Sequence, residues 1–269
     1  MKKIFTKLSA FVVCFALLLT CSFGAANLSV SAETELPTFT SKVGVNTYEY
    51  TVTGGEATII KATAKGDVII PETLDGYPVV ALGDKAFYYQ WDIESVTVPS
   101  CVKTIGDGCF RDCINMKSAV IEDGVEKIGA YAFYSFVVIW GEDDIEAEYY
   151  SSLESLVLPD SVKYIGESAF LDTLLSGELK LPASLQYLGE SAFSGCSSLT
   201  SMTIGNSVTS IGNSVFNGCT ALTTIIIPNS VASIGSFAFG DCSSLTSVAI
   251  PNSVTYIGDY AFYHCTDLI

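Results

Sequence analysis

Cysteine is the residue type that could carry the most chemistry in this sequence, because it forms disulfides, binds metals and acts as a nucleophile. Five cysteines stand in a column, each three residues after a phenylalanine: Cys113, Cys196, Cys219, Cys242 and Cys265. Metal binding is disfavoured, because C-x-x-C spacing and histidine partners are missing. Cysteines that repeat at one spacing point the same way in neighbouring copies, and free cysteine packs as a small hydrophobe. We therefore expect reduced, buried thiols, with a pairing among Cys101, Cys109 and Cys113 as the alternative.

The single histidine, His264, could act as a general base only if the fold locked it beside a nucleophile. Its neighbour Cys265 does not meet that condition, because adjacent residues on a turn point apart. The slot of His264 holds Gly195, Gly218 and Asp241 in other copies, so we expect His264 to face solvent. No glycine-rich phosphate loop or dinucleotide fingerprint is present in the sequence. The sequence therefore predicts no enzyme activity and no cofactor.

An acidic and aromatic segment, at about residues 137–150, could bind a cation or a partner. It contains Trp140, Glu142, Asp143, Asp144, Glu146, Glu148, Tyr149 and Tyr150. Its spacing lacks the Asp-x-Asp-x-Asp-Gly pattern of a calcium loop, so we expect no metal site. Tryptophan and tyrosine supply contact area at low entropic cost, which makes the aromatic residues and residues 142–144 candidate partner-binding residues. The alternative is a loop without function, since added loop length costs little free energy.

An internal repeat organises these residues. Eight phenylalanines are separated by 23, 23, 37, 23, 23, 23 and 23 residues, and the single 37 marks a 14-residue insertion. They are Phe87, Phe110, Phe133, Phe170, Phe193, Phe216, Phe239 and Phe262. A glycine stands four residues before every one of them, and a proline stands eleven residues before Phe in five copies. Agreement of several columns over eight copies indicates a repeat architecture.

The residues of each repeat copy predict the same short secondary-structure elements. Before the proline, apolar residues alternate with others, as at Ile225 and Ile227 or at Val248 and Ile250, which is typical of a short strand that proline ends. A Val-x-x-Ile stretch predicts a second short strand, and the glycine after it provides a positive φ or a close approach between coils. The Ala-Phe-x-x-Cys stretch predicts a helical or 3₁₀ turn that drives the phenylalanine inward. One copy cannot bury its apolar side alone, so stacked copies must bury it together.

The run from Leu222 to Cys242, LTTIIIPNSVASIGSFAFGDC, resembles the 23-residue unit of BspA-like bacterial leucine-rich repeats. The resemblance covers about residues 58–269. It implies a curved repeat solenoid on secreted or surface proteins, whose members are associated with adhesion to host or matrix proteins and to other cells. The family offers no catalytic motif to carry over. The chain departs from the repeat pattern at Glu122, which replaces a proline, and at Ser176, which replaces a leucine beside Leu174 and Leu175.

The predicted fold is a repeat solenoid, mainly β with short helical or 3₁₀ turns: a right-handed leucine-rich-repeat coil of about eight to nine 23-residue units over residues 58–269. Residues 33–57 do not fit the period. Two strands, at residues 48–52 and 57–60, joined by a glycine turn, predict an N-terminal β cap behind a flexible leader at 33–42. No cap follows the last coil at Asp267–Ile269, so we expect an uncapped C-terminus and end-to-end self-association there.

Residues 1–32 have the pattern of a signal peptide. Three lysines precede an apolar run at residues 8–19, and Val30 and Ala32 form an A-x-A-like cleavage site. The run is too short for a comfortable membrane span of about 20 residues. The alternatives are a lipoprotein signal that ends at Cys21 and an anchor that is not cleaved. We therefore expect a secreted or cell-surface protein, cleaved near Ala32.

The charge of the chain restricts its partners. After removal of a signal that holds three of the 13 basic residues, 10 basic and 29 acidic residues leave a net charge of −19. Such a charge argues against nucleic acid and against direct binding to anionic membranes, because both require clustered lysine and arginine. On the outer face of the main strands, a nearly uncharged strip makes Thr203, Ile226 and Ala249 further candidate contacts, unless it reflects only ordinary β-propensity.

Together these features predict a secreted or cell-surface module for protein binding or adhesion. Its partner is expected to be a protein or another cell-surface macromolecule. The alternative is a structural spacer, or a self-associating repeat segment of a larger surface protein.

Overall fold

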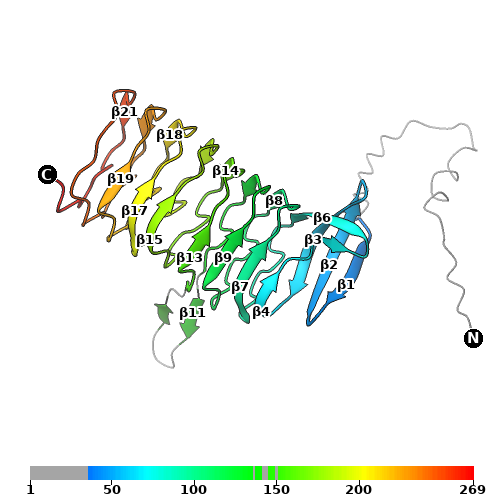
Figure 1. Cartoon of the computed structure of the whole chain (residues 1–269). Coiled ribbons are helices and arrows are strands. Elements are labelled where there is room, and N and C mark those ends of the chain that lie inside the picture. The colour runs from blue at the N-terminus through cyan, green and yellow to red at the C-terminus, as the bar shows by residue number, and fades with distance from the viewer. Residues whose placement is uncertain (1–35, 136, 141–144, 149–150) are drawn as a thin grey trace, which may run out of the picture. The chain divides into compact units, whose positions relative to one another are not determined.

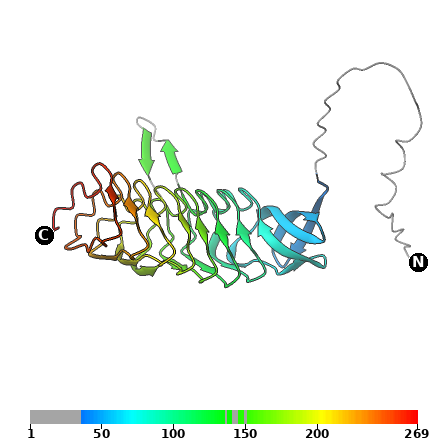
Figure 2. The same cartoon turned by 90° about the horizontal axis from the view of Figure 1, so that it is seen from above.

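The computed structural model describes residues 36–135, 137–140, 145–148 and 151–269, and the chain from Leu36 onward forms one unit of short strands. Successive coils follow one another along one axis (Figure 1, Figure 2). A typical coil places one strand in a main sheet and a second strand in another sheet, and it closes with a side made of turns. The predicted signal peptide, at residues 1–32, lies outside the described residues.

An antiparallel sheet begins the described chain. It contains β1 (Thr38–Val43), β2 (Asn46–Thr53) and β3 (Glu56–Thr63), and β3 then pairs in parallel with β6 (Tyr77–Leu82). The two expected strands are β2 and β3, whereas the leader expected at residues 33–42 is wrong in part, because residues 38–43 pair with β2. Tyr48 on β2 is buried and meets Phe87 edge-on, with ring centroids 6.3 Å apart. This sheet therefore covers the first ring of the phenylalanine row.

Two sets of parallel strands run along the solenoid. The main strands are β4 (Gly66–Ile69), β7 (Ile93–Val98), β9 (Ser118–Ile121), β13 (Ser155–Val157), β15 (Gly177–Lys180), β17 (Leu199–Thr203) and β19 (Thr224–Ile226). The second set pairs from β6 through β8 (Thr104–Ile105), β10 (Lys127–Ile128), β14 (Tyr164–Ile165) and β16 (Tyr187–Leu188). After a break it resumes as a separate sheet of β18 (Ser210–Ile211), β20 (Ser233–Ile234) and β21 (Tyr256–Ile257). A short strand, β5 (Thr73–Leu74), pairs with β6. Both expected strands are thus present in every repeat except that of Phe262, and side chains that alternate inward form the core.

The phenylalanine column forms a continuous row of stacked rings. Neighbouring rings from Phe87 to Phe262 have centroids 4.9 to 6.1 Å apart, close to the spacing of paired strands at about 4.8 Å. The row does not break at the insertion, because Phe133 and Phe170 stack at 5.2 Å. The predicted repeat solenoid is confirmed, and the inserted residues leave the coil without disturbing its register.

The third side of each coil is a run of hydrogen-bonded turns instead of the expected helical or 3₁₀ turn. In all eight copies, the residue two before the phenylalanine has a positive φ of 52° to 59°. A residue in this left-handed region stops a right-handed helix from continuing. The N–H groups of Lys85, Phe87 and Tyr89 instead donate to carbonyls of the next coil, at 2.9, 2.8 and 3.1 Å. Hydrogen bonds between coils therefore run along this side as well as through the two sheets.

Close packing between coils explains the glycine column. None of its eight glycines has a positive φ, so of the two roles expected for this column only close approach applies. A Cβ at Gly189 would lie 2.4 Å from the backbone nitrogen of Glu167 and 2.4 Å from the carbonyl carbon of Gly166. Gly212 is the looser position, where the nearest atom to an added Cβ is a flexible side-chain carbon of Glu190 at 3.5 Å.

The main sheet is interrupted between β13 and β15, although β14 and β16 of the same two coils pair. Leu175, one residue early, fills the core slot that Ser176 leaves empty, and Gly177 has a φ of 76° at an irregularity in the register of β15. The departure at Ser176 therefore leaves the solenoid intact but separates its main sheet into two parts.

The strand expected around Val248 and Ile250 does not form. Just before this segment, a long hydrogen bond of 3.5 Å from Thr246 N to Thr223 O connects the chain to the previous coil, and Ile250 is exposed.

Within the insertion, β11 (Val137–Trp140) pairs antiparallel with β12 (Ile145–Glu148).

The glycine column gives a matched test of coil stacking. Gly189→Ala should lower the free energy of unfolding by about 1–3 kcal/mol, because backbone atoms of the previous coil cannot move aside. Gly212→Ala should leave it within about 1 kcal/mol of wild type, since the site has room and alanine restricts the unfolded chain. Urea unfolding of both variants measures the difference. Equal losses at the two positions would show that close approach is not the role of this column.

Candidate macromolecule-binding surface

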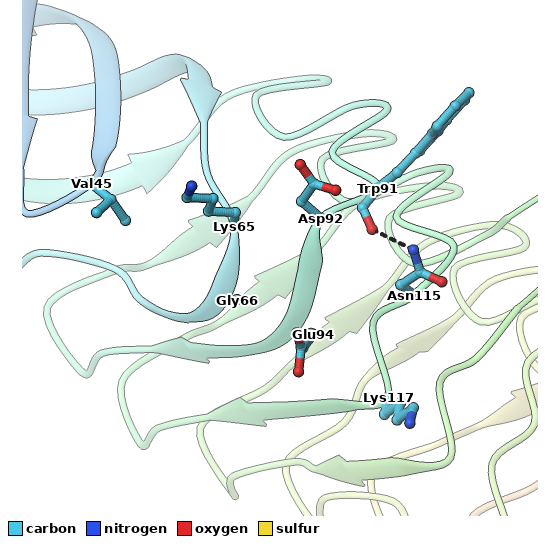
Figure 3. Close-up of a pocket in the computed structure, with 8 residues that line it drawn as sticks. All are labelled: Val45, Lys65, Gly66, Trp91, Asp92, Glu94, Asn115 and Lys117. Carbon is cyan, nitrogen blue, oxygen red and sulfur yellow. Dashed lines mark hydrogen bonds between the residues drawn. The ribbon is translucent and has the colours of Figure 1, made fainter.

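A groove lies between the N-terminal sheet and the first coils (Figure 3). One wall is formed by Val45 in the turn before β2, by Lys65 in the connection from β3 to β4, and by Gly66 at the start of β4. The other wall is formed by the residues around the start of β7 and by those that precede β9 in the next coil. Together the walls comprise Val45, Lys65, Gly66, Trp91, Asp92, Glu94, Asn115 and Lys117. The cavity has a volume of about 750 Å³, and an adjoining hollow of about 390 Å³ adds Tyr89 and Gln90 to its lining. We refer to both cavities as the Trp91 groove.

Two aromatic side chains form the rim of the Trp91 groove. Tyr89 and Trp91 are each 50% exposed, and their ring centroids lie 6.2 Å apart in an edge arrangement. In Figure 3 the indole of Trp91 points away from Val45 and Lys65 and stands clear of the wall. Such a ring presents a large apolar surface to solvent without covering the core.

Hydrogen bonds fix the backbone beneath these rings. Asn115 Nδ2 donates to the Trp91 carbonyl at 2.7 Å, which ties the loop to the next coil. The Ala64 N–H donates to Gln90 Oε1 at 3.0 Å, and the Lys65 N–H donates to Asn46 Oδ1 at 3.2 Å. Both walls are therefore held in place before a ligand arrives, which reduces the entropic cost of binding.

The charges in the Trp91 groove are mixed. Lys65 and Lys117 face a region that also holds Asp92 and Glu94, and all four residues are exposed. Among the ion pairs of the described residues, none joins these four. They are thus free to pair with charges of either sign on a partner, which favours orientation and specificity more than affinity.

A cationic and aromatic cluster adjoins the groove. Tyr88 and Tyr89 have ring centroids 4.1 Å apart, and the Arg111 guanidinium lies 5.9, 5.9 and 5.4 Å from the rings of Tyr88, Tyr131 and Tyr134. These distances permit cation–π attraction. The hydrogen bond with Tyr89, together with burial, raises the pKa of Tyr88 to about 12. The Tyr131 hydroxyl donates to Glu167 Oε1 at 2.8 Å, and this bond raises the pKa of Tyr131.

Most candidate residues in the insertion lie outside the described residues. These are Glu142, Asp143, Asp144, Tyr149 and Tyr150. Trp140 ends β11, and the structure fixes only its backbone pairing with Ile145. The partner-binding role expected for these residues therefore stays a prediction.

The outer strip of the main strands is present in part. Thr203 on β17 pairs with Ile226 on β19, and Ile226 is 62% exposed. Ala249 is exposed but belongs to the segment that forms no strand. Two further apolar side chains of the strip, Val120 and Val157, also face solvent.

One feature of the sequence does indicate the Trp91 groove. It is a departure from the repeat pattern, so it is missed when only the shared columns are compared. Four residues after the phenylalanine, the first copy places Trp91, whereas no other copy has an aromatic residue. Four copies have a small hydroxyl residue there and three have an aliphatic one: Ser197, Thr220, Ser243 and Thr266, and Ile114, Val137 and Leu174. The run Tyr88–Trp91 is thus a local departure toward large aromatic residues at positions that the fold leaves exposed. Its walls could not be found in this way, because Val45 and Lys65 precede the first main strand, β4, and have no counterpart in the repeat columns.

Burial disfavours the reactive thiolate form at four of the five cysteines of the column, all except the half-buried Cys265. The thiols of Cys113, Cys196, Cys219 and Cys242 each donate to the carbonyl of the phenylalanine one coil earlier, at 3.2 Å. Burial raises the pKa of Cys196 to about 12 and that of Cys219 well above its usual value. All seven cysteines of the described chain are free thiols.

His264 is exposed, as expected, and its Nδ1 lies 3.1 Å from Asp241 Oδ1. In the described residues, no group of three or more histidine, cysteine or acidic side chains could hold a metal ion. No helix in that part of the chain is long and apolar enough to cross a membrane.

Comparison with known proteins places this geometry among repeat proteins. The model of the BspA type leucine-rich repeat region matches residues 80–140 and 145–269, in six copies. No curated protein matches the sequence.

Two solved structures share the fold. The leucine-rich repeat protein TpLRR of T. pallidum is 26% identical, with a TM-score of 0.64, over 80% of this chain and 96% of that one. A leucine-rich repeat protein from Bacteroides ovatus ATCC 8483 is also 26% identical, with a TM-score of 0.60, over 85% of this chain and 63% of that one.

Thiol labelling tests the buried cysteine column. In a folded chain that starts at residue 33, a thiol reagent such as DTNB should modify only the half-buried Cys101 and Cys265 within minutes. The other five cysteines should react only after unfolding, because the thiolate is the nucleophile and burial disfavours it. In a Cys101→Ser/Cys265→Ser variant the early reaction should vanish. Rapid labelling of Cys196 in the folded chain would contradict the burial of the column.

Proposed function

The chain belongs to the BspA-type leucine-rich repeat family, and we propose that it is a secreted or cell-surface module that binds a protein partner and catalyses no reaction. The signal-peptide pattern of residues 1–32 supports export. The proposed role is adhesion or capture, in which a rigid repeat scaffold presents one contact surface.

The observation that carries this proposal is the exposed aromatic rim of the Trp91 groove. Tryptophan, tyrosine and arginine are the residue types that dominate the energy of protein interfaces. Trp91 and Tyr89 stand together here, and Arg111 lies over the ring of the adjoining Tyr88. A groove whose backbone is already fixed loses little entropy on binding. The two lysines and two carboxylates around it would then orient the partner.

The charge of the chain also favours a protein partner. With 13 basic and 29 acidic residues, the chain as a whole repels nucleic acid and anionic lipid. A local site with both charge signs, such as the Trp91 groove, suits a polypeptide surface that also carries both signs.

The insertion remains a second proposed contact for the same function. Insertions in solenoids extend from one face, and this one carries Trp140, Tyr149 and Tyr150. A triple substitution of these three residues by serine would test its part in binding separately from the groove.

Trp91 and Tyr89 can be replaced without disturbing the fold. Trp91→Ser installs the residue that other copies carry at this position, and Tyr89→Gly suits a residue whose φ is 59°. The double variant should retain its unfolding midpoint and lose at least about tenfold in affinity, as expected for removal of central aromatic contacts. Binding to a panel of immobilised extracellular-matrix and cell-surface proteins measures this loss.

Tyr187→Ser is the matched control, because Tyr187 is similarly exposed on the second sheet, where Ser210 and Ser233 hold the equivalent position. It should bind like wild type. If the double variant binds the same panel members with unchanged affinity, the Trp91 groove is not the contact site. If the wild-type chain binds no member of the panel, the proposal of a protein-binding module loses its support.

A further inference from the structure

The main sheet has an open edge at its N-terminal end. Its first strands pair in the order β13, β9, β7 and β4, and within the described residues β4 pairs only with β7. The second sheet differs, because the N-terminal strands β1, β2 and β3 continue it beyond β6. The N-terminal sheet thus extends one of the two sheets of the solenoid and leaves the edge of β4 without a neighbouring strand.

Two residues of β4 direct unpaired backbone groups toward this open edge. The N–H of Ile70, just after β4, donates to the Thr97 carbonyl of β7 at 3.0 Å. Because the peptide groups of successive strand residues point to opposite sides, those of Asp67 and Ile69 point away from β7. Outside the pairing of β4 with β7, no hydrogen bond between described residues involves the N–H or the carbonyl of Asp67 or Ile69. The edge therefore offers two donors and two acceptors at strand spacing.

The side chains of β4 leave the edge accessible. Natural edge strands are often protected by lysine, proline or a projecting charge. Lys65 and Pro71 flank β4, but the strand itself contains neither residue type. Its one charged residue, Asp67, accepts a hydrogen bond from Ser95 Oγ of β7 at 2.5 Å, so its carboxylate is directed away from the open edge. Ile69 is 73% exposed, more than any other apolar side chain of the main strands.

The Trp91 groove lies at the start of this edge. Gly66 is the first residue of β4 and also lines the groove. A Cβ added to Gly66 would meet no atom within 4 Å, so there is space beside this residue. In Figure 3, Lys65 and Gly66 lie between Val45 and the strand that carries Asp92 and Glu94. A chain that occupies the groove can therefore continue along the edge of β4.

We infer that the partner of the Trp91 groove is an extended polypeptide segment that adds to the main sheet as a strand beside β4. The pairing rests on the proposed function, in which this groove binds a protein partner. The backbone of the segment bonds to the free N–H and carbonyl groups of Asp67 and Ile69, while an adjoining part of it contacts the rim formed by Tyr89 and Trp91. Backbone pairing of this kind supplies affinity, and the side chains beside it supply specificity.

The geometry of the free groups selects an extended segment over other protein surfaces. Donors and acceptors that alternate along a strand match the backbone of a second strand, whereas a helix already uses its own N–H and carbonyl groups internally. On the outer face, the residue beside Ile69 would continue the apolar strip that includes Val120 and Val157. We therefore expect a β-branched or other apolar residue at that position of the partner.

Peptides that bind the groove provide the probe. Linear peptides of about twelve residues are selected from a phage-displayed library on the immobilised wild-type chain that starts at residue 33. Those that bind Tyr89→Gly/Trp91→Ser more weakly than wild type are retained, because they contact the rim. If no selected peptide depends on the rim, both the proposed contact site and the strand pairing lose their support.

Two substitutions of Ile69 then separate its N–H from its side chain. Ile69→Pro removes the outward N–H, and edge strands accept proline there. Ile69→Thr keeps the N–H and installs the residue that Thr97 and Thr203 provide at this position in other coils. Both variants should unfold at the wild-type midpoint. Ile69→Pro should bind the retained peptides about fivefold or more weakly, as expected for one lost hydrogen bond, whereas Ile69→Thr should keep most of the affinity.

Two measurements on the wild-type chain make the test independent of how the variants fold. Methylation of the peptide nitrogens, one at a time, should weaken binding at every second residue of the part that pairs with β4, because alternate N–H groups face the edge. The amides of Asp67 and Ile69 should exchange rapidly in the free chain and slowly in the complex. The Val68 amide, which faces β7, should exchange slowly in both.

Equal peptide affinities of folded Ile69→Pro and Ile69→Thr, a methylation profile without a two-residue period, or unprotected Asp67 and Ile69 amides in the complex would overturn the strand pairing. Since the peptides are chosen for their dependence on Tyr89 and Trp91, such a result would leave the groove as the contact site. Protection of the same two amides that rises with the concentration of the free chain would assign the edge to a second copy and would also overturn the inference.

Discussion

Each coil depends on its neighbour both for the partners of its backbone hydrogen bonds and for the cover of its phenylalanine. Bonds between coils run through two sets of short strands and along the side of turns, while the rings from Phe87 to Phe262 stack at about one strand spacing. This requirement fixes the 23-residue period, because a coil of another length would move its ring and its N–H groups out of register. It also explains why the inserted residues leave the coil after Phe133: the ring of Phe170 keeps its place.

The sequence allowed the period, the phenylalanine row and both strands of the coil to be predicted, because these features recur in every copy. It did not reveal the conformation of the turns. Ala-Phe-x-x-Cys has helix-like spacing, yet Ser191 and Tyr260 two residues earlier adopt the same left-handed φ, so residue type gives no warning. The break in the main sheet at Ser176 escaped prediction for a different reason. It results from a one-residue shift, in which Leu175 takes the core slot and Gly177 absorbs the extra residue.

The candidate binding surface lies where the copies differ, and this explains which of its parts could be predicted. Repeat columns describe the scaffold that all coils share, whereas Trp91 and Tyr89 stand at positions where no other copy has a tryptophan, tyrosine or phenylalanine. The tryptophan could have been noticed as such a departure, but Val45 and Lys65 reach the groove through the N-terminal sheet, which has no counterpart in the repeat. The side made of turns follows the same rule. Its aromatic residues occupy positions that serine fills elsewhere, so the scaffold stays constant while its surface becomes specific.

Amide hydrogen exchange tests most directly whether hydrogen bonds between coils hold the side of turns. The N–H groups of Phe110, Phe193 and Phe216 donate to the next coil at 2.8, 3.0 and 2.9 Å, so they should exchange as slowly as those of β7 and β17. The N–H groups of the exposed turn at Gly54–Gly55 should exchange rapidly by comparison. Rapid exchange at the three phenylalanines, with protection confined to the strands, would contradict the account, because the turns would then be ordinary loops that do not join the coils.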